Sequence, residues 1–509
     1  MLKNMKKSLA DMLGKEYIDK VIEANCFFDE SSREKFKQAA YEEVNFYPEY
    51  KQEASEKLAE KIGEKVMDAF DNDNMGAAST SFQNAFNKDS APMSGRGCYR
   101  IGEDGRLYFV GKSEHYHSSL GHGFDGYKLI DNARKLNILN ATHNNTRGYV
   151  SRVLERELIK AANGVESEEE LADILKSNEK HVLNRVISLE TGSLAAEAAM
   201  KMMLNRFYDI QGKGSKYEER IPVFFVMGDY SGGTEANYHG TTIFAQTLRN
   251  MWASLYKKED DSAVYKVVPV KINDINDFKA KIEEYNKPPY KTAGFMHEIV
   301  LMNYGGILLD KEFLQEAYSL CREYDTPTMV DEIQSCVWYK ELLLFRRYGL
   351  TPDFVIIGKG FSGGEYPASK VITTAEMDTL VQFGALVTNG QEELASLSYL
   401  ITMKFVQFNG EKIEENQQYL YSGLENLATK YSTKVKSVEG LGYLAALVFD
   451  SLEKAKEFAV KACEMCIDVS AQTYKIHCPA AVLLKLPLVA TKKEIEAILK
   501  KFEIILNMM

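Results

Sequence analysis

Two short motifs in this chain carry residue types that can act together on an aldehyde. One is a lysine between two glycines, Gly358-Lys359-Gly360, and the other is the run Asp331-Glu332-Ile333-Gln334. An amine forms a Schiff base with an aldehyde, and an aspartate keeps a nearby ring nitrogen protonated. Taken alone, the first motif is better explained as a surface lysine after a buried strand, and the second as an aspartate at a strand end. Their chemistry becomes specific if the fold brings them together.

The segments before the two motifs predict that the fold does so. Apolar runs precede them, Thr328-Met329-Val330 in one case and Phe354-Val355-Ile356-Ile357 in the other. Such runs, separated by helical stretches, are typical of parallel strands in an α/β sheet. Ligands of these sheets bind at the carboxyl ends of the strands. An amine and a carboxylate at that edge suit pyridoxal phosphate (PLP), whose aldehyde needs Lys359 and whose ring nitrogen needs Asp331.

Two further segments supply what else this cofactor needs. Thr191-Gly192-Ser193 follows the apolar run 186–189 and leads into helix formers at 194–204. Backbone N–H groups at such a helix N-terminus can bind the phosphate. Tyr238-His239-Gly240 offers an aromatic ring for the face of the pyridine, next to a glycine that gives room. Taken alone, the first segment is an ordinary helix cap and the second holds one of 29 tyrosines, so their context carries the prediction.

The order of these segments resembles that of the class-III aminotransferases, which are PLP enzymes of fold-type I. The resemblance runs from about Gly95 to the C-terminus. It implies that Lys359 forms the Schiff base and that Asp331 pairs with the ring nitrogen, so these two would be the catalytic residues. It also implies further cofactor contacts: Gly192 and Ser193 at the phosphate, Tyr238 and His239 at the ring, the strand-end Glu298, Gln334 near the phenolic oxygen, and Thr388 at the phosphate of the neighbouring subunit's cofactor.

Two positions depart from the family pattern on the substrate side. Thr241 stands where many members that handle α-amino acids or 2-oxoglutarate have an arginine, and Lys485 stands where many have another. Arginine binds a carboxylate through two parallel hydrogen bonds, and lysine lacks that planar fork. The sequence therefore favours an amine or ω-amino acid donor whose distal end is not clamped at Thr241.

The fold that these patterns and the resemblance predict is α/β, a fold-type I PLP-dependent transferase. A large domain with a mostly parallel sheet flanked by helices is expected at residues 150–390. A smaller α+β domain would form from both chain ends, residues 95–149 and 391–509. A helical N-terminal extension, residues 1–94, would precede it.

Local patterns add three predictions outside the large domain. Strands 99–101 and 107–110 should form a hairpin around Asp104-Gly105. Residues 89–97 should be a loop. A long helix should cover 394–430.

Composition limits the partners and the compartment. A net charge of −11 argues against non-specific nucleic-acid binding, which needs a basic face. No apolar run approaches the roughly 20 residues of a membrane span, and no secretory signal is expected. Seven scattered cysteines indicate reduced thiols and a cytoplasmic protein. No metal is expected, although His115, His117 and His122 lie close together in the sequence, because no carboxylate-rich helix accompanies them.

The predicted activity is transfer of an amino group from an amine, ω-amino acid or amino acid to a keto acid or aldehyde, by a ping-pong mechanism through Lys359. Other PLP reactions on the same fold stay open, namely amino acid racemisation or epimerisation, an aminomutase reaction, or decarboxylation. A third hypothesis is a non-catalytic binding protein that keeps the fold. A homodimer with shared active sites is expected, because Thr388 would act on the neighbouring subunit.

Overall fold

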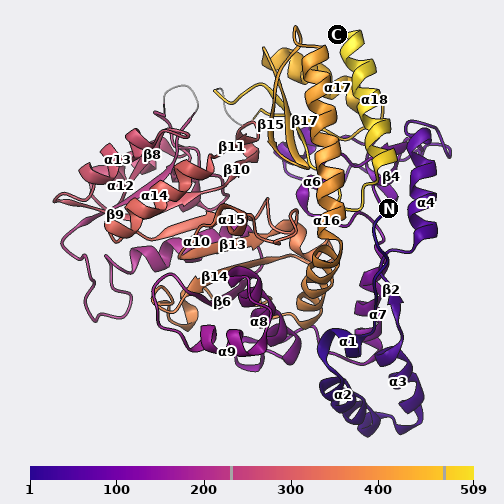
Figure 1. Ribbon diagram of the computed structural model, residues 1–509, viewed down its shortest axis with the longest axis horizontal. Helices are drawn as coiled ribbons and strands as arrows, with labels where there is room; N and C mark the ends of the chain where they lie inside the picture. The colour runs from indigo at the N-terminus through magenta and orange to yellow at the C-terminus, as the bar shows by residue number, and fades with distance from the viewer. Residues whose placement is uncertain (230–232, 474–476) are drawn as a thin grey trace.

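A seven-stranded sheet forms the centre of the large domain in the computed structural model, which describes residues 1–229, 233–473 and 477–509 (Figure 1). Its strand order is β6-β14-β13-β12-β9-β7-β8. Within this sheet β14 runs antiparallel to both neighbours and the other six strands run parallel to one another. The strands are β6 (Leu183–Leu189), β7 (Ile221–Met227), β8 (Lys266–Val270), β9 (Tyr290–His297), β12 (Thr328–Asp331), β13 (Phe354–Gly358) and β14 (Ser369–Thr374).

Both faces of this sheet are buried, which explains why its strands are apolar runs and not alternating patterns. In β7, Phe224 and Val226 face a cluster built with α10, whereas Val223 and Phe225 face the opposite core, which includes α13 and α14. The helices of the large domain are α8 (Tyr149–Asn163), α9 (Glu168–Lys176), α10 (Gly192–Leu204), α11 (Ile243–Thr247), α12 (Ala253–Asp261), α13 (Ile275–Glu284), α14 (Lys311–Glu323) and α15 (Leu344–Tyr348). A short hairpin of β10 (Val300–Leu301) and β11 (Ile307–Leu308) follows β9.

The smaller domain combines segments from both parts of the chain. The Phe109 N–H donates to the Cys466 carbonyl, and the Asp468 N–H donates back to the Phe109 carbonyl, so the early hairpin pairs with the C-terminal part. The early elements are β3 (Pro92–Arg96), β4 (Tyr99–Gly102), β5 (Leu107–Phe109), the turn α6 (Ser113–Tyr116) and α7 (Lys128–Lys135). The late elements are α16 (Glu393–Lys430), β15 (Val435–Leu441), β16 (Leu444–Phe449), α17 (Leu452–Glu464), β17 (Ser470–Ala471), β18 (Ala481–Leu484) and α18 (Lys492–Met508).

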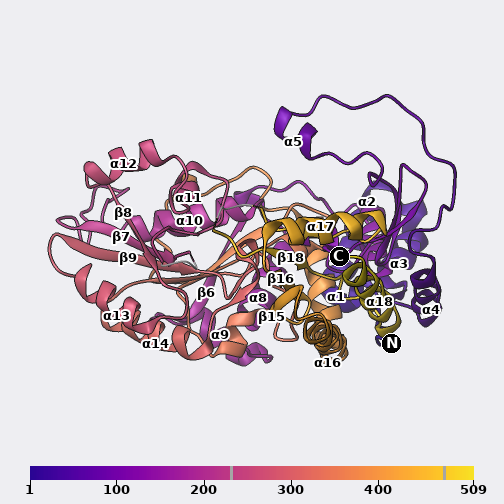
Figure 2. The ribbon, with the colours of Figure 1, turned by 90° about the horizontal axis from the view of Figure 1, so that it is seen from above.

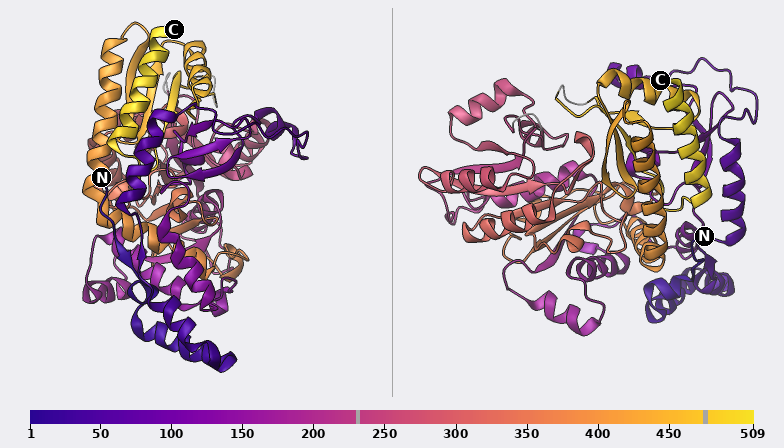
Figure 3. Two further views of the ribbon diagram at one scale, coloured as in Figure 1. Left: turned by 90° about the vertical axis from the view of Figure 1, so that its right-hand side faces the viewer. Right: turned by 45° about the horizontal axis from the view of Figure 1, so that its top comes forward.

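The N-terminal segment is mainly helical and packs on the smaller domain. Asn409 on α16 binds the backbone of Lys3, and Ser55 on α4 donates to Glu494 on α18. Its elements are β1 (Lys6–Lys7), α1 (Leu9–Leu13), α2 (Lys15–Phe28), α3 (Arg33–Tyr41), β2 (Val44–Asn45), α4 (Glu49–Leu58) and α5 (Thr80–Ala85). Figure 2 shows α5 on a long loop that stands away from the body, and Figure 3 shows α2 and α3 at the far end from α18.

The local predictions hold except at one strand. The hairpin forms between β4 and β5, and α16 covers the predicted long helix. The loop prediction for residues 89–97 is wrong, because 92–96 form β3, an exposed edge strand paired with β4. The predicted boundary between residues 94 and 95 therefore falls inside this strand. In the ranges that the structure describes, no helix combines the length and apolar composition needed to cross a membrane.

Candidate active site

The two motifs meet at the carboxyl edge of the large sheet. β12 and β13 are parallel neighbours, with Asp331 opposite Ile356, so the end of β12 lies beside the segment that leads into Lys359. Lys359 and Asp331 line one cavity of about 590 Å³. Gly192, Ser193, His239, Glu298 and Gln334 line it too. The fold thus brings together seven of the nine predicted site residues; Tyr238 and Thr388 do not line this cavity.

Asp331 is buried at the end of β12 and is held by two donors. The Tyr238 hydroxyl donates to Asp331 Oδ2 at 2.8 Å, and the Ile333 N–H donates to Oδ1 at 3.0 Å. Burial raises the pKa of Asp331 to about 6, while the two hydrogen bonds and the charge of Lys359 favour its ionised form. Because that value lies below neutral pH, the carboxylate can serve as an anion in the cavity.

Glu298 forms the second buried acid of the cavity. Gln334 Nε2 donates to Glu298 Oε2 at 3.1 Å. Burial, and then the charge of Asp331, raises the pKa of Glu298 to about 8. At neutral pH the pair therefore carries its negative charge on Asp331. The amide oxygen of Gln334 is buried and has no hydrogen-bond partner among the described residues.

Lys359 begins a short 3₁₀ turn after β13, with a left-handed φ of 44°. Its Nζ lies 5.0 Å from the ring centroid of Tyr116 and makes no hydrogen bond or ion pair with residues that the structure describes. Burial lowers the pKa of Lys359, and the charges of Glu298 and Asp331 oppose that change. The side chain is an amine in a protein interior with no fixed partner, as a covalent attachment point requires.

The N-terminus of α10 forms the opposite wall of the cavity. Gly192 packs so closely on Ile333 that a Cβ would lie 2.1 Å from its Cδ1 atom, which explains the glycine. The Ser193 hydroxyl lies 2.6 Å from the Thr241 hydroxyl and accepts the Thr241 N–H at 3.1 Å. The first turn of α10 thus presents backbone N–H groups where an anion can bind. Thr241, expected on the substrate side, contacts this predicted phosphate end.

His239 and Tyr238 occupy different places although they are adjacent in the sequence. Tyr238 is almost fully buried, and its hydroxyl binds Asp331. His239 lines the cavity, and its Nδ1 lies 2.9 Å from an Arg249 guanidinium nitrogen. Burial, and then the charges of Arg249 and Lys359, lowers the pKa of His239 to about 3, so its ring stays neutral. The stacking role assigned to Tyr238 stays a prediction, and of these two adjacent residues His239 is the one that lines the cavity.

Thr388 lies outside the cavity of its own chain. It is exposed, and the next residue, Asn389, donates its N–H to Glu190 Oε1 at 3.2 Å. Its predicted contact with a neighbouring subunit stays a prediction.

The sequence interpretation assigned no cofactor or substrate role to four polar residues of the cavity, His115, His117, Glu190 and Glu365. Lys485, expected at a substrate position, lies buried and does not line the cavity. The histidines had been weighed only as metal ligands; of that group, His122 instead binds Glu114 at 3.0 Å. The sequence signal for a binding role was that His115 and His117 lie shortly before Gly121 and Gly123.

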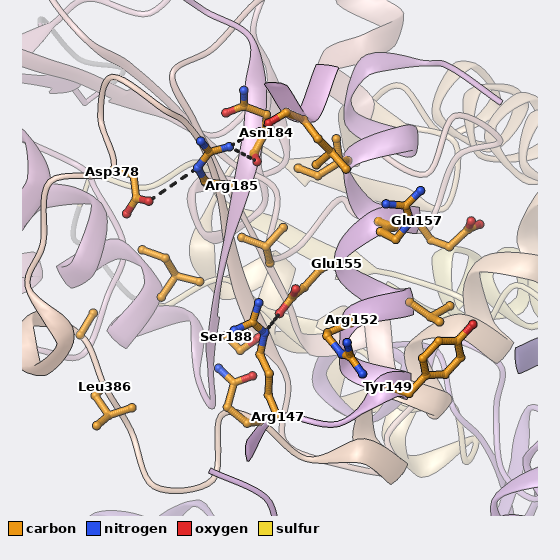
Figure 4. A pocket seen from close by; sticks show the side chains of 18 of the residues that line it. Arg147, Tyr149, Arg152, Glu155, Glu157, Asn184, Arg185, Ser188, Asp378 and Leu386 are labelled. Carbon is orange, nitrogen blue, oxygen red and sulfur yellow. Dashed lines mark hydrogen bonds and ion pairs between the residues drawn. The ribbon is translucent and has the colours of Figure 1, made fainter. Parts of the chain in front are cut away.

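A second and larger cavity, of about 930 Å³, lies between α8, β6 and the segment 378–391 (Figure 4). Its acidic side chains have cationic partners, for example Arg147 with Glu155 at 3.1 Å and Arg185 with Asp378 at 3.9 Å. None of the predicted site residues lines it.

The smaller cavity fits pyridoxal phosphate. Among the residues that the structure describes, it offers an unpaired amine at Lys359, a buried anion at Asp331, a helix N-terminus at Gly192 and an unpaired amide oxygen at Gln334. These correspond to the aldehyde, ring nitrogen, phosphate and phenolic group of the cofactor.

Comparisons with known proteins agree. A family model described as aminotransferase class-III matches residues 95–506. An ornithine aminotransferase from Emericella nidulans is 28% identical over 321 residues, which are 61% of this chain and 66% of the relative. A probable mitochondrial ornithine aminotransferase from Caenorhabditis elegans is 27% identical over 281 residues, 55% of this chain and 62% of the relative. Each alignment spans slightly less than two thirds of the relative.

Solved structures share the fold. The ornithine aminotransferase from Toxoplasma gondii superimposes with a TM-score of 0.65 at 18% identity, over 83% of this chain and 91% of that one. At this identity the likeness concerns the fold, and it confirms the predicted α/β, fold-type I class.

Proposed function

Because this chain belongs to the class-III aminotransferase family, whose cofactor is pyridoxal phosphate, we propose that it is a transaminase that moves an amino group from an amine or amino acid to a keto acid or aldehyde. The single observation that carries the proposal is the cavity in which an unpaired Lys359 amine faces the buried Asp331 carboxylate. A binding protein that had lost catalysis would have no need of this costly arrangement of buried charges.

Pyridoxal phosphate, when bound, supplies an electron sink for charge that develops on the substrate carbon. Asp331 maintains that property by holding an anion next to the ring nitrogen. Its ionised form is supported by the Tyr238 hydroxyl and the Ile333 N–H, which both donate to it. The protonated state of Glu298 at neutral pH keeps a second negative charge away from the same ring.

Lys359 anchors the cofactor and afterwards moves the proton. Its lowered pKa keeps a fraction of the amine neutral, which is the form that can accept a proton. Nζ would take the proton from the carbon that bears the donor's amino group and hold it until the transfer is complete. The N-terminus of α10 and the neutral His239 ring would hold the cofactor's phosphate and ring while this happens.

The amino donor is proposed to be an amine or an ω-amino acid. No arginine is among the described residues that line the cavity, so a carboxylate at the distal end of the donor has no bidentate partner there. Glu190 and Glu365 do line it, and both favour an uncharged or cationic distal group. Ornithine, the substrate in the names of the relatives, also carries a second amino group.

The active form is proposed to be a cytoplasmic homodimer. Thr388 is exposed next to the Asn389–Glu190 contact, and Glu190 lines the cavity. A second subunit could therefore approach the cofactor site from this side.

The visible absorption spectrum of the PLP-loaded protein, followed during addition of a panel of amines, tests the proposal. Conversion of the imine band to the pyridoxamine band, reversed by a keto acid, is the expected result, and the fastest amines identify the donor class. A band that forms but never converts would instead favour racemase, mutase or decarboxylase chemistry. Absence of any band would exclude a PLP enzyme.

A further inference from the structure

A second lysine, Lys485, is buried directly beside the predicted catalytic lysine. It follows β18 and is completely buried. Its Nζ donates a hydrogen bond to the Gln334 carbonyl oxygen, in the motif that carries Asp331. The same Nζ lies 3.8 Å from a ring centroid of Trp338 and 4.7 Å from that of Tyr116. A cation in this position is stabilised by two aromatic faces and has no carboxylate partner among the described residues.

Lys485 and Lys359 share one aromatic ring. The Tyr116 centroid is 4.7 Å from Lys485 Nζ and 5.0 Å from Lys359 Nζ. Tyr116 is the last of four consecutive residues with left-handed φ values between 47° and 74°, beginning at Ser113. This conformation is unfavourable for L-residues, so the surrounding structure must hold it. The Ser113 hydroxyl donates to the Lys485 carbonyl oxygen at 2.6 Å and thereby ties the turn to the second lysine.

Trp338 links the second lysine to the backbone around Lys359. A Cβ on Gly360 would lie 2.2 Å from the Trp338 ring, so the ring packs directly on the residue after Lys359. Trp338 Nε1 in turn donates to the Leu486 carbonyl at 3.2 Å, one residue after Lys485. The Lys485 amine is thus enclosed by Tyr116, Trp338 and the Gln334 carbonyl. Tyr116 also lies against Lys359, and Trp338 packs on the residue that follows it.

We propose that Lys485 is a positioning residue for Lys359: its buried amine fixes the Tyr116 and Trp338 rings and the Gln334 backbone around the Lys359 side chain and so keeps water from the Lys359 nitrogen. This inference rests on the proposed function, because it assigns Lys485 to the same PLP site. It also gives Lys485 a role other than clamping a substrate carboxylate, since its amine points at Gln334 and the rings.

The charge balance around Lys359 supports this assignment. The titratable groups that face Lys359 are Glu298, Asp331, Cys336, His115, His239 and Lys485. The histidines are neutral, because burial and nearby positive charges lower their pKa values to about 4 and 3. Asp331 favours a protonated Lys359, and burial opposes it, so the walls that keep water from the Lys359 nitrogen influence its charge. Burial, and then the charge of Lys359, also lowers the pKa of Lys485, as expected for two amines that compete for charge.

The test replaces Lys485 with uncharged residues in the full-length, PLP-loaded protein. Lys485→Met keeps the length of the side chain, and Lys485→Gln keeps an N–H donor for the Gln334 carbonyl. Removing the amine loosens the aromatic walls and lets water reach the Lys359 nitrogen, which makes that nitrogen easier to protonate, so the pH midpoint of its visible absorption band should rise by about one unit in both variants. In the cofactor-free chain, the pH at which Lys359 is half-maximally acetylated, followed by peptide mass spectrometry, should rise in the same direction.

Two control variants separate this positioning role from general stability. Lys485→Arg keeps an N–H donor and a cation against the two rings and should leave the midpoint within a few tenths of a unit of wild type. Lys370→Met removes another buried lysine, which lies 5.1 Å from the Tyr399 ring centroid and does not line the cavity. It should lower thermal stability without moving either midpoint, as expected for a lysine with a purely structural role.

Unchanged midpoints in both Lys485→Met and Lys485→Gln would overturn the inference, as would a shift that Lys370→Met reproduces. If Lys485→Met does not fold, Lys485→Gln carries the test alone. Failure of the proposed function looks different: Lys359→Ala would then retain the visible band, whatever the Lys485 variants do.

Discussion

Two cavities of this protein differ in how their charges are arranged. In the cavity of about 930 Å³ between α8 and β6, the acids have cationic partners, such as Arg147 with Glu155 and Arg185 with Asp378 (Figure 4). In the cavity of about 590 Å³ at the carboxyl edge of the sheet, no carboxylate of the described residues lies within ion-pair distance of the Lys359 amine. The smaller cavity is therefore the one whose charges are left for a ligand.

This difference teaches that the ion pairing of the lining side chains identifies the candidate active site better than the volume of the cavity does. Both cavities contain unpaired neutral amide oxygens, on Asn184 and Gln391 in the larger one and on Gln334 in the smaller one, so these atoms do not discriminate. A buried charge without a partner costs far more than an unpaired amide, and folded proteins retain it where a ligand compensates for it. The following predictions test this distinction.

The largest effect is expected for Lys359→Ala. Removing the only unpaired cavity amine of the described residues should abolish the visible PLP band and lower the rate of amino transfer by about 10³-fold or more. Mass spectrometry after borohydride reduction should show a cofactor adduct on the wild-type peptide that contains Lys359 and none on the variant. Lys370→Met, a buried lysine outside the cavity, serves as the matched control and should retain the adduct. A normal adduct in Lys359→Ala would show that another amine binds the cofactor.

A smaller effect, about tenfold in kcat, is expected for Tyr238→Phe. This change keeps the ring and removes the hydroxyl that donates to Asp331 at 2.8 Å, so the carboxylate loses one group that favours its ionised form. Steady-state kinetics with the best donor of the panel measures the change. His239→Phe gives the complementary test, because it alters the ring that faces the cavity. If Tyr238→Phe has no effect, Tyr238 acts through its ring, as the sequence resemblance implied.

Much of this site was predictable from the sequence, because its geometry follows from strand order. The apolar runs before Asp331 and Lys359 predicted parallel strands, and their pairing as neighbours puts both residues at one edge. The family, the fold class and PLP as the cofactor are confirmed by the comparisons. The helix start at Gly192 was equally accessible, because it depends only on residues that are local in the sequence.

Other features depend on tertiary contacts, which local patterns do not reveal. The left-handed turn at 113–116 contains no glycine, so propensity alone could not predict it. Strand β3 is exposed and has no alternation of apolar residues, which is why it was predicted to be a loop. The choice between Tyr238 and His239 for the cavity wall also depends on packing, since adjacent aromatic residues look equivalent in the sequence.

Glu298→Gln should change the pH dependence of stability. The pKa of Glu298 is about 8 in the folded chain, above its ordinary value of 4.5, so the folded state holds a proton that the unfolded state releases between these values. Folding stability therefore falls as pH rises through this window, and the loss is complete above about pH 8. The cofactor-free variant cannot ionise at this position and should lose about 3 kcal/mol less than wild type on going from about pH 5 to 8.

Thermal unfolding of both cofactor-free proteins across this range measures the difference. Asp331 is unchanged in the variant and should still contribute a decline at lower pH, between its ordinary value and about 6. Parallel stability curves for Glu298→Gln and wild type would mean that Glu298 is already ionised in the folded chain. The negative charge of the site would then not be confined to Asp331.

The smallest effect is expected in the larger cavity. Arg185 and Asp378 form a pair at 3.9 Å, and each side chain is almost 40% exposed, so solvent screens their attraction. Arg185→Gln should therefore change the free energy of unfolding by less than about 1 kcal/mol and the rate of amino transfer by less than about twofold. Denaturant unfolding and steady-state kinetics measure both quantities. Asp378→Asn and the double variant complete a double-mutant cycle. A tenfold loss of amino transfer in Arg185→Gln would contradict the distinction between the two cavities. The larger cavity, whose acids have cationic partners, would then take part in the reaction.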